Sequence, residues 1–105
     1  MSNDLEVIES LKKEGIELEE VKELEYWNGD EGYILNENIV IQLSIYDRIV
    51  SKKIFYILSK LINLKYLYLK SNQITTIPDS LSNLSNLEYL DLNSNQIHTF
   101  LHNKN

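Results

Sequence analysis

The chain has 105 residues, 43% of them hydrophobic, and a formal net charge of −6. One hydrophobic core fits within this length, and the many Leu, Ile and Val residues exclude a disordered chain. Cysteine is absent, which excludes disulfides and thiolate metal sites. No apolar run is long enough to cross a bilayer and no signal peptide is recognisable, so we expect a soluble cytoplasmic protein without membrane contact.

The N-terminal third is strongly acidic. Residues 1–37 carry 12 Asp or Glu against 3 Lys, a charge that repels phosphate backbones, so we expect no nucleic-acid partner. Asn3 and Glu6 have the spacing of a capping box, an apolar stripe follows, and Gly15 provides a stop. The pattern predicts a helix over about 3–14.

A β-hairpin is predicted over about 24–35. Two short apolar runs lie on either side of an Asn-Gly-Asp turn at 28–30, which is typical of a hairpin. A further strand is expected over 39–45. Trp27 is interpreted as a core residue of this region, with a partner-binding anchor as the alternative.

A repeat of 23 to 24 residues dominates the rest of the chain. Its second copy is Leu64-x-x-Leu67-x-Leu69-x-x-Asn72-x-Ile74-x-x-Ile77-Pro78-x-x-Leu81-x-x-Leu84, and its third is Leu87-x-x-Leu90-x-Leu92-x-x-Asn95-x-Ile97-x-x-Phe100. A degenerate first copy, Leu43-x-Ile45-x-x-Arg48-x-Val50, has Arg in place of Asn. The copies are therefore 40–63, 64–86 and 87–105, the last one truncated.

Each copy changes its apolar spacing part-way along. The Leu-x-Leu alternation predicts a short strand whose leucines face inward, and the spacing of three and four that follows predicts a turn and a short helical segment. Asn72 and Asn95 come just after the strands. Their side-chain amides can pair with backbone groups that the bend leaves without partners.

These motifs resemble the leucine-rich repeat family, over about 66 of the 105 residues. The resemblance implies an α/β fold, a short right-handed solenoid with a parallel sheet on its concave side. Because a solenoid needs its first coil covered, residues 1–39 are predicted to be a helix-plus-hairpin N-terminal cap. The first repeat is expected to be irregular at Arg48. The resemblance also implies non-catalytic protein–protein recognition.

The concave face is the predicted binding surface. Tyr66 and Tyr89 occupy the same repeat position, so they are expected about 5 Å apart on neighbouring strands. Tyrosines among polar groups are typical of protein interfaces, although tyrosines that merely cover a short sheet would give the same pattern. The predicted contacts for a protein partner are Tyr46, Tyr66, Tyr68, Lys70, Tyr89, Asp91 and Asn93.

The C-terminal end suggests an alternative function. The third repeat lacks the leucines that would follow its last apolar residues, so the end either folds back or stays open. An open end predicts a self-assembling unit, as a weak two-fold homodimer. The predicted self-association residues are Leu92, Ile97, Phe100 and Leu101.

Catalytic and metal chemistry find little support in the sequence. No Gly-rich phosphate loop or Gly-x-Ser-x-Gly nucleophile motif occurs. His98 and His102 are four residues apart, a spacing that on a helix suits a metal, but no acidic residue is near them in sequence. We therefore predict no enzyme, no cofactor and no catalytic, cofactor-binding or metal site.

Overall fold

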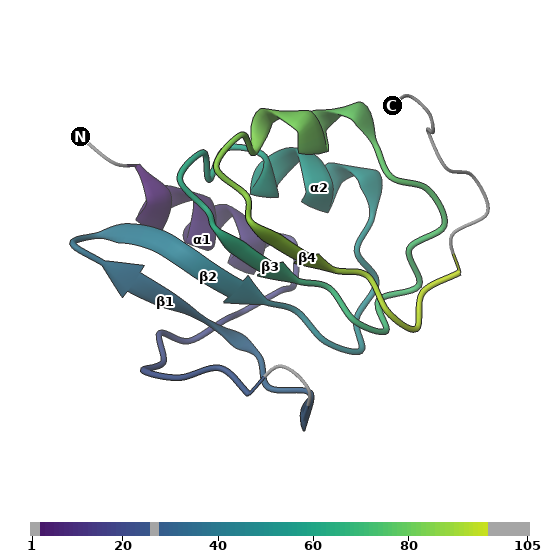
Figure 1. The fold of residues 1–105 in the computed structure, drawn as a ribbon, viewed down its shortest axis with the longest axis horizontal. Coiled ribbons are helices and arrows are strands. Elements are labelled where there is room, and N and C mark those ends of the chain that lie inside the picture. The colour runs from purple at the N-terminus through teal and green to yellow at the C-terminus, as the bar shows by residue number, and fades with distance from the viewer. Residues whose placement is uncertain (1–2, 26–27, 97–105) are drawn as a thin grey trace.

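A mixed four-stranded sheet organises the computed structural model, which describes residues 3–25 and 28–96. Figure 1 shows the strands side by side in the order β1-β2-β3-β4, with the helices on one side of the sheet. The elements are α1 (Asp4–Lys13), β1 (Gly32–Asn36), β2 (Ile39–Ser44), α2 (Lys52–Leu58), β3 (Tyr66–Tyr68), the 3₁₀ helix η2 (Asp79–Asn83) and β4 (Tyr89–Asp91).

The parallel part of the sheet follows the sequence repeat. Leu43 of β2 pairs with Leu67 of β3, and Leu67 pairs with Leu90 of β4. The two offsets equal the spacings between the repeat copies. Each of the three repeats therefore contributes one strand to the sheet, in the same register.

A helical segment follows each of the first two parallel strands. α2 begins after Ser51, whose Oγ accepts a hydrogen bond from the Ile54 amide at 3.4 Å. In the next repeat Pro78 precedes η2, which is shorter and of the 3₁₀ type. The apolar side of α2 packs into the core through Ile54, Phe55, Ile57 and Leu58.

α1 lies where a helix over 3–14 is predicted. Asn3 makes no side-chain capping bond, so the predicted capping box is not formed by that residue. Asp4 instead fixes the start of the helix to the sheet, because its buried carboxylate accepts a hydrogen bond from the Val40 amide at 2.9 Å. The apolar stripe of α1 is buried through Val7, Ile8 and Leu11.

The predicted hairpin over 24–35 is wrong: the structure forms its hairpin one element later, between β1 and β2. Leu24 and Glu25 lie outside any strand, and the next two residues, including Trp27, lie outside the described residues. Glu37 and Asn38 form the turn with φ of 53° and 69°. Two consecutive positive φ values give the turn whose twist matches that of paired strands. The three repeat strands are parallel as predicted, but β1 joins them antiparallel to β2, so the sheet as a whole is mixed.

Residues 19–21 cover the outer edge of β1. The Tyr33 amide donates to the Glu19 carbonyl at 3.0 Å, and the Val21 amide donates to the Tyr33 carbonyl at 2.9 Å. Gly32 permits this approach, because a Cβ there would lie 2.8 Å from the Glu19 carbonyl oxygen. Only glycine fits between the two segments.

A single core lies between the sheet and the helices. Its fully buried members come from the first two repeats and α1, whereas Leu87, Leu90 and Leu92 of the third repeat are only partly buried. The N-terminal segment and the repeats therefore share one core, and burial decreases towards β4. The fully buried leucines are Leu11, Leu43, Leu58, Leu61, Leu64, Leu67 and Leu69.

Truncating equivalent leucines in successive strands should reveal this gradient. Leu67→Ala should lower the free energy of unfolding by about 2–5 kcal/mol, because the side chain is fully buried. Leu90→Ala, at the equivalent position, should cost clearly less because Leu90 is partly exposed. Urea denaturation followed by circular dichroism measures both values, and equal losses would contradict the described packing.

Candidate functional site

The sheet face opposite the helices carries the predicted binding residues. Gln42, Tyr66 and Tyr89 are neighbours on successive strands. Ile34 of β1 pairs with Gln42 and extends this row. A second row joins Ser44, Tyr68 and Asp91. We call this surface the tyrosine face, and define it by Ile34, Gln42, Ser44, Tyr66, Tyr68, Tyr89 and Asp91.

The tyrosines of this face differ in exposure. Tyr89 is 43% exposed, Tyr66 is half-buried, and Tyr68 is 7% exposed. The ring of Tyr68 lies 5.8 Å from that of Tyr89, with the planes tilted by 54°. Tyr66 and Tyr89 are paired in register as predicted, but this ring contact runs diagonally, a distance that aromatic side chains can reach. An exposed ring thus lies against a buried one.

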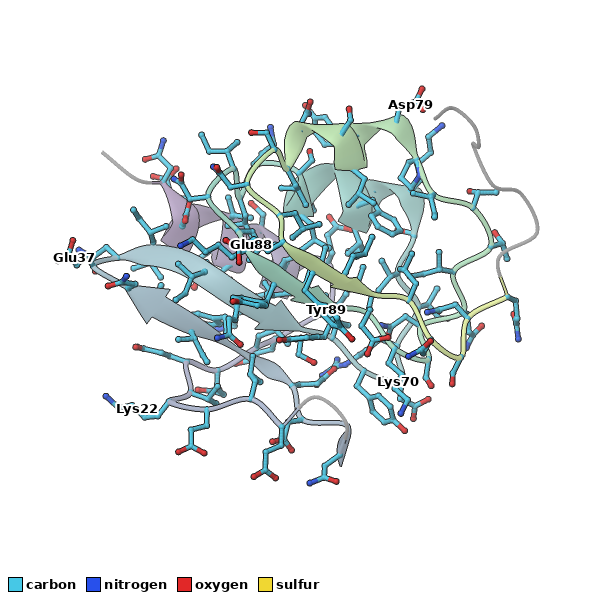
Figure 2. The ribbon with its side chains drawn as sticks, viewed as in Figure 1. Lys22, Glu37, Lys70, Asp79, Glu88 and Tyr89 are labelled. Carbon is cyan, nitrogen blue, oxygen red and sulfur yellow. The ribbon has the colours of Figure 1, made fainter. Side chains whose placement is uncertain are left out.

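Tyr46, Lys70 and Asn93 lie just beyond the ends of β2, β3 and β4, at the same repeat position. Tyr46 and Asn93 are exposed and Lys70 is half-buried. Figure 2 shows Lys70 beyond the strands, on the same side of the molecule as Tyr89. The predicted residues therefore fall into two groups, one on the strands and one at the turns that follow.

Those turns repeat in every coil. Asp47, Ser71 and Ser94 have φ of 58°, 61° and 61°, and each immediately follows one of the three residues at the strand ends. The left-handed conformation turns the chain out of the sheet at the same point each time. The first repeat keeps this turn although it lacks the asparagine.

Asn72 joins the second coil to the first. Its side chain is fully buried, its Oδ1 accepts from the Arg48 amide at 2.8 Å, and its Nδ2 donates to the Ile45 carbonyl at 2.6 Å. One side chain therefore satisfies a donor and an acceptor of the preceding turn.

Asn95 joins the third coil to the second in a related way. Its Oδ1 accepts from the amides of Asn72 and Ile74, at 2.8 and 2.9 Å. Its Nδ2 donates to the Leu69 carbonyl at 2.7 Å. The positions of Tyr46 and Lys70 are thus fixed by asparagine side chains of the following coil.

Arg48 occupies the asparagine position of the first repeat but connects in the other direction. Its Nε and Nη2 donate to the two carboxylate oxygens of Glu31 at 2.9 and 2.7 Å, and Nη1 donates to the Gly15 carbonyl at 3.3 Å. The hydrogen bond with Glu31 raises the pKa of Arg48. Arg48 therefore links the repeats to the N-terminal segment.

Residues 28–31 lie along the β2 end of the tyrosine face. The Ser44 hydroxyl donates to the Asp30 carbonyl at 2.6 Å, and the Tyr46 amide donates to the Glu31 carboxylate at 3.0 Å. The Tyr46 ring lies so close to Gly29 that a Cβ there would be 3.0 Å from it. These contacts were not predicted from the sequence. One sequence signal could have pointed to them: Arg48 stands at the asparagine position of the first repeat, and an arginine there favours an acidic partner such as Glu31.

Tyr33 is not part of the tyrosine face. It pairs with the buried Leu43, so its side chain is on the helix side of the sheet. Burial, and then the charges of nearby glutamates, raise the pKa of its phenol. The ring therefore stays neutral at physiological pH.

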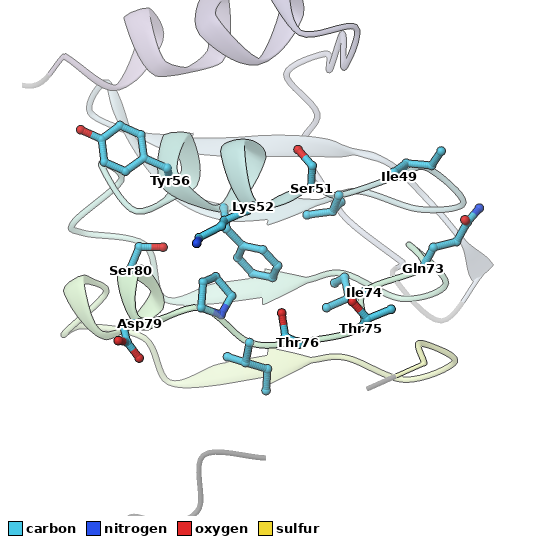
Figure 3. Close-up of a pocket in the computed structure, with 14 residues that line it drawn as sticks. Ile49, Ser51, Lys52, Tyr56, Gln73, Ile74, Thr75, Thr76, Asp79 and Ser80 are labelled. Atoms are coloured by element: carbon cyan, nitrogen blue, oxygen red, sulfur yellow. The ribbon is translucent and has the colours of Figure 1, made fainter. Parts of the chain in front are cut away.

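A groove of about 610 Å³ lies between α2 and residues 73–80 (Figure 3). Its lining includes the apolar Phe55, Ile74 and Pro78, and two charged residues, Lys52 and Asp79. It shares no residue with the tyrosine face.

Several residues singled out from the sequence fall outside the described residues: His98, His102, Ile97, Phe100 and Leu101. Leu92, the remaining self-association residue, is partly buried against the core. Within 3–25 and 28–96, no three His, Asp or Glu side chains gather as a metal ion would require. None of the helices in these ranges has the length and apolar character needed to cross a membrane.

Comparison with protein families identifies the repeats. Residues 56–97 match the family model described as Leucine rich repeat. Over these residues the chain is similar to leucine-rich repeats. The match includes β3, η2, β4 and both asparagines, and does not include α1, β1 or β2. No curated protein matches the chain. Leucine-rich repeat domains are generally non-catalytic modules that bind proteins.

The Arg48–Glu31 pair should contribute measurably to stability. Arg48→Lys keeps the charge but loses the two parallel hydrogen bonds, and should lower the free energy of unfolding by about 1 kcal/mol. As a control, Lys53→Gln removes a single bond of 3.0 Å to Glu14 from a lysine side chain that is 67% exposed, and should cost less than about 0.5 kcal/mol. Urea denaturation compares the two, and a larger loss for the Lys53→Gln variant would contradict this assignment.

Proposed function

We propose that this chain is a non-catalytic recognition module that binds a protein partner through the tyrosine face. The leucine-rich repeat match makes protein binding the general expectation. The observation that favours this face is the row of Tyr66 and Tyr89 beside the buried Tyr68. The further predicted contacts are Asp91 on the face and Tyr46, Lys70 and Asn93 just beyond the strand ends.

The tyrosine face combines contact area with a rigid backbone. A tyrosine offers a large ring and a hydroxyl while losing little side-chain freedom on binding. Strand pairing and the asparagine contacts hold the backbone under these rings in place. A pre-organised surface loses less entropy when a partner binds.

We also propose how the repeats are arranged and which residues cap them. We infer a short right-handed solenoid with the tyrosine face on its concave side, since strand–helix–strand connections between parallel strands are almost always right-handed. Residues 1–39 would cap its first coil. The core shared by α1 and the repeats, and the cover of β1 by residues 19–21, support that role.

Self-association is the second candidate. β4 is the last strand within the described residues, and Leu90 and Leu92 are only partly buried there. A second copy meeting this end would form a two-fold, self-limiting contact. Light scattering of the protein alone reports such a dimer. The cytoplasmic location and the absence of nucleic-acid and membrane partners stay predictions.

Removing the rings of Tyr66 and Tyr89 should weaken partner binding without unfolding the protein. Tyr66→Ala combined with Tyr89→Ala should cost about 2 kcal/mol or more of binding free energy, as at other aromatic hot spots. The matched control is Tyr56→Ala, which removes a 58% exposed tyrosine from α2. A partner captured from cell extract is titrated calorimetrically against each variant.

Circular dichroism checks that each variant is folded. Binding of the double variant at wild-type affinity would show that the partner contacts another surface. An equal loss in Tyr56→Ala would show the same.

A further inference from the structure

Charge is unevenly distributed at the end of the tyrosine face where the strands finish. Asp30 and Asp47 are exposed beside Ser44 and Tyr46. Arg48 lies here too, but its charge is matched by the carboxylate of Glu31. Lys70 is then the remaining cation among the described residues at these strand ends. Carboxylates therefore exceed cations around the exposed rings.

Asp91 adds a negative charge on the face itself. It is 4% exposed and pairs in register with Tyr68. Its Oδ1 accepts from the Asn93 amide at 2.9 Å, and the structure gives the carboxylate no other donor among the described residues. Two carboxylate oxygens can accept about four hydrogen bonds, of which the described residues supply one. A buried carboxylate in this state is stabilised by a cation.

We propose that the tyrosine face binds a segment of a protein partner that is rich in Lys or Arg. The inference rests on the proposed function and specifies the chemistry of the partner. Cationic side chains of the segment lie over the exposed tyrosine rings, which attract cations through their π faces. Their charged groups approach Asp30 and Asp91.

Two properties of the molecule favour a basic partner over an acidic one. Residues 1–37 carry 12 acidic side chains against 3 lysines, and this field attracts a basic segment over a long range. An acidic segment would meet that field and would add a further carboxylate beside Asp91. The second property is that Arg48, a cation that could bind an acidic segment, is already paired with Glu31 at 2.7 Å.

The test uses three labelled peptides of equal length, in which Ser alternates with Lys, Glu or Asn. Fluorescence anisotropy at physiological ionic strength measures their binding to the full chain. The face variant combines Asp30→Asn with Asp91→Asn. An asparagine oxygen can still accept from the Glu25 amide at position 30 and from the Asn93 amide at position 91, so the fold should persist.

The matched control removes two charges from other surfaces. It combines Asp79→Asn on η2 with Glu9→Gln on α1, both exposed. Figure 2 shows Asp79 on the helix side, far from Tyr89 and Lys70. We expect the Lys peptide to bind most tightly, the face variant to weaken it about tenfold or more, and the control to change it less than about twofold.

Other outcomes are decisive as well. An equal loss in the control variant would show general charge attraction and overturn the inference, as would no binding of the Lys peptide. The Tyr66→Ala variant distinguishes failure of the basic-partner inference from failure of the proposed binding face. If the Glu or Asn peptide binds best and Tyr66→Ala weakens it, the proposed function stands and the basic partner is wrong. If Tyr66→Ala changes the binding of no peptide that binds, the proposed function fails too.

Discussion

The structure depends on how the chain satisfies its backbone where each strand ends. The chain bends away from the sheet there, and amides and carbonyls of the bend are left inside the molecule. The side chains of Asn72 and Asn95 pair with these groups in the coil before their own. A buried backbone group without a partner costs about 1–3 kcal/mol, so the asparagines decide whether neighbouring coils can stack.

This constraint extends to the proposed binding surface. Because each coil turns at the same residue, successive strands enter the sheet in the same register, and the tyrosines fall in rows. In the first repeat Arg48 stands at the asparagine position, and its guanidinium binds Glu31. Residues 28–31 therefore lie beside Ser44 and Tyr46. The face is therefore bounded on one side by an acidic segment.

The sequence predicted what local periodicity controls. The repeat period gave the offsets of the parallel strands, and Leu-x-Leu alternation separated Leu67 from Tyr66 and Tyr68. An apolar stripe ending at a glycine likewise predicted a helix where α1 lies. In each case the signal is confined to a few neighbouring residues or to one fixed period.

Long-range contacts were beyond such reasoning. The hairpin was misplaced because Asn-Gly-Asp at 28–30 is the stronger turn motif, whereas Glu37 and Asn38 make the turn with positive φ. The bond from Val40 to Asp4 spans 36 residues, and Arg48 meets Glu31 across 17. No local pattern reports which distant carboxylate a backbone amide or a guanidinium will find.

Amide hydrogen exchange tests most directly whether the asparagine side chains hold the coils together. The amides of Arg48, Asn72 and Ile74 donate to asparagine oxygens, so they should exchange only through global unfolding. The amide of Glu23, an exposed loop residue, serves as the fast reference. Protection of all three amides near the global stability is the predicted result, and exchange as fast as that of Glu23 would contradict the account.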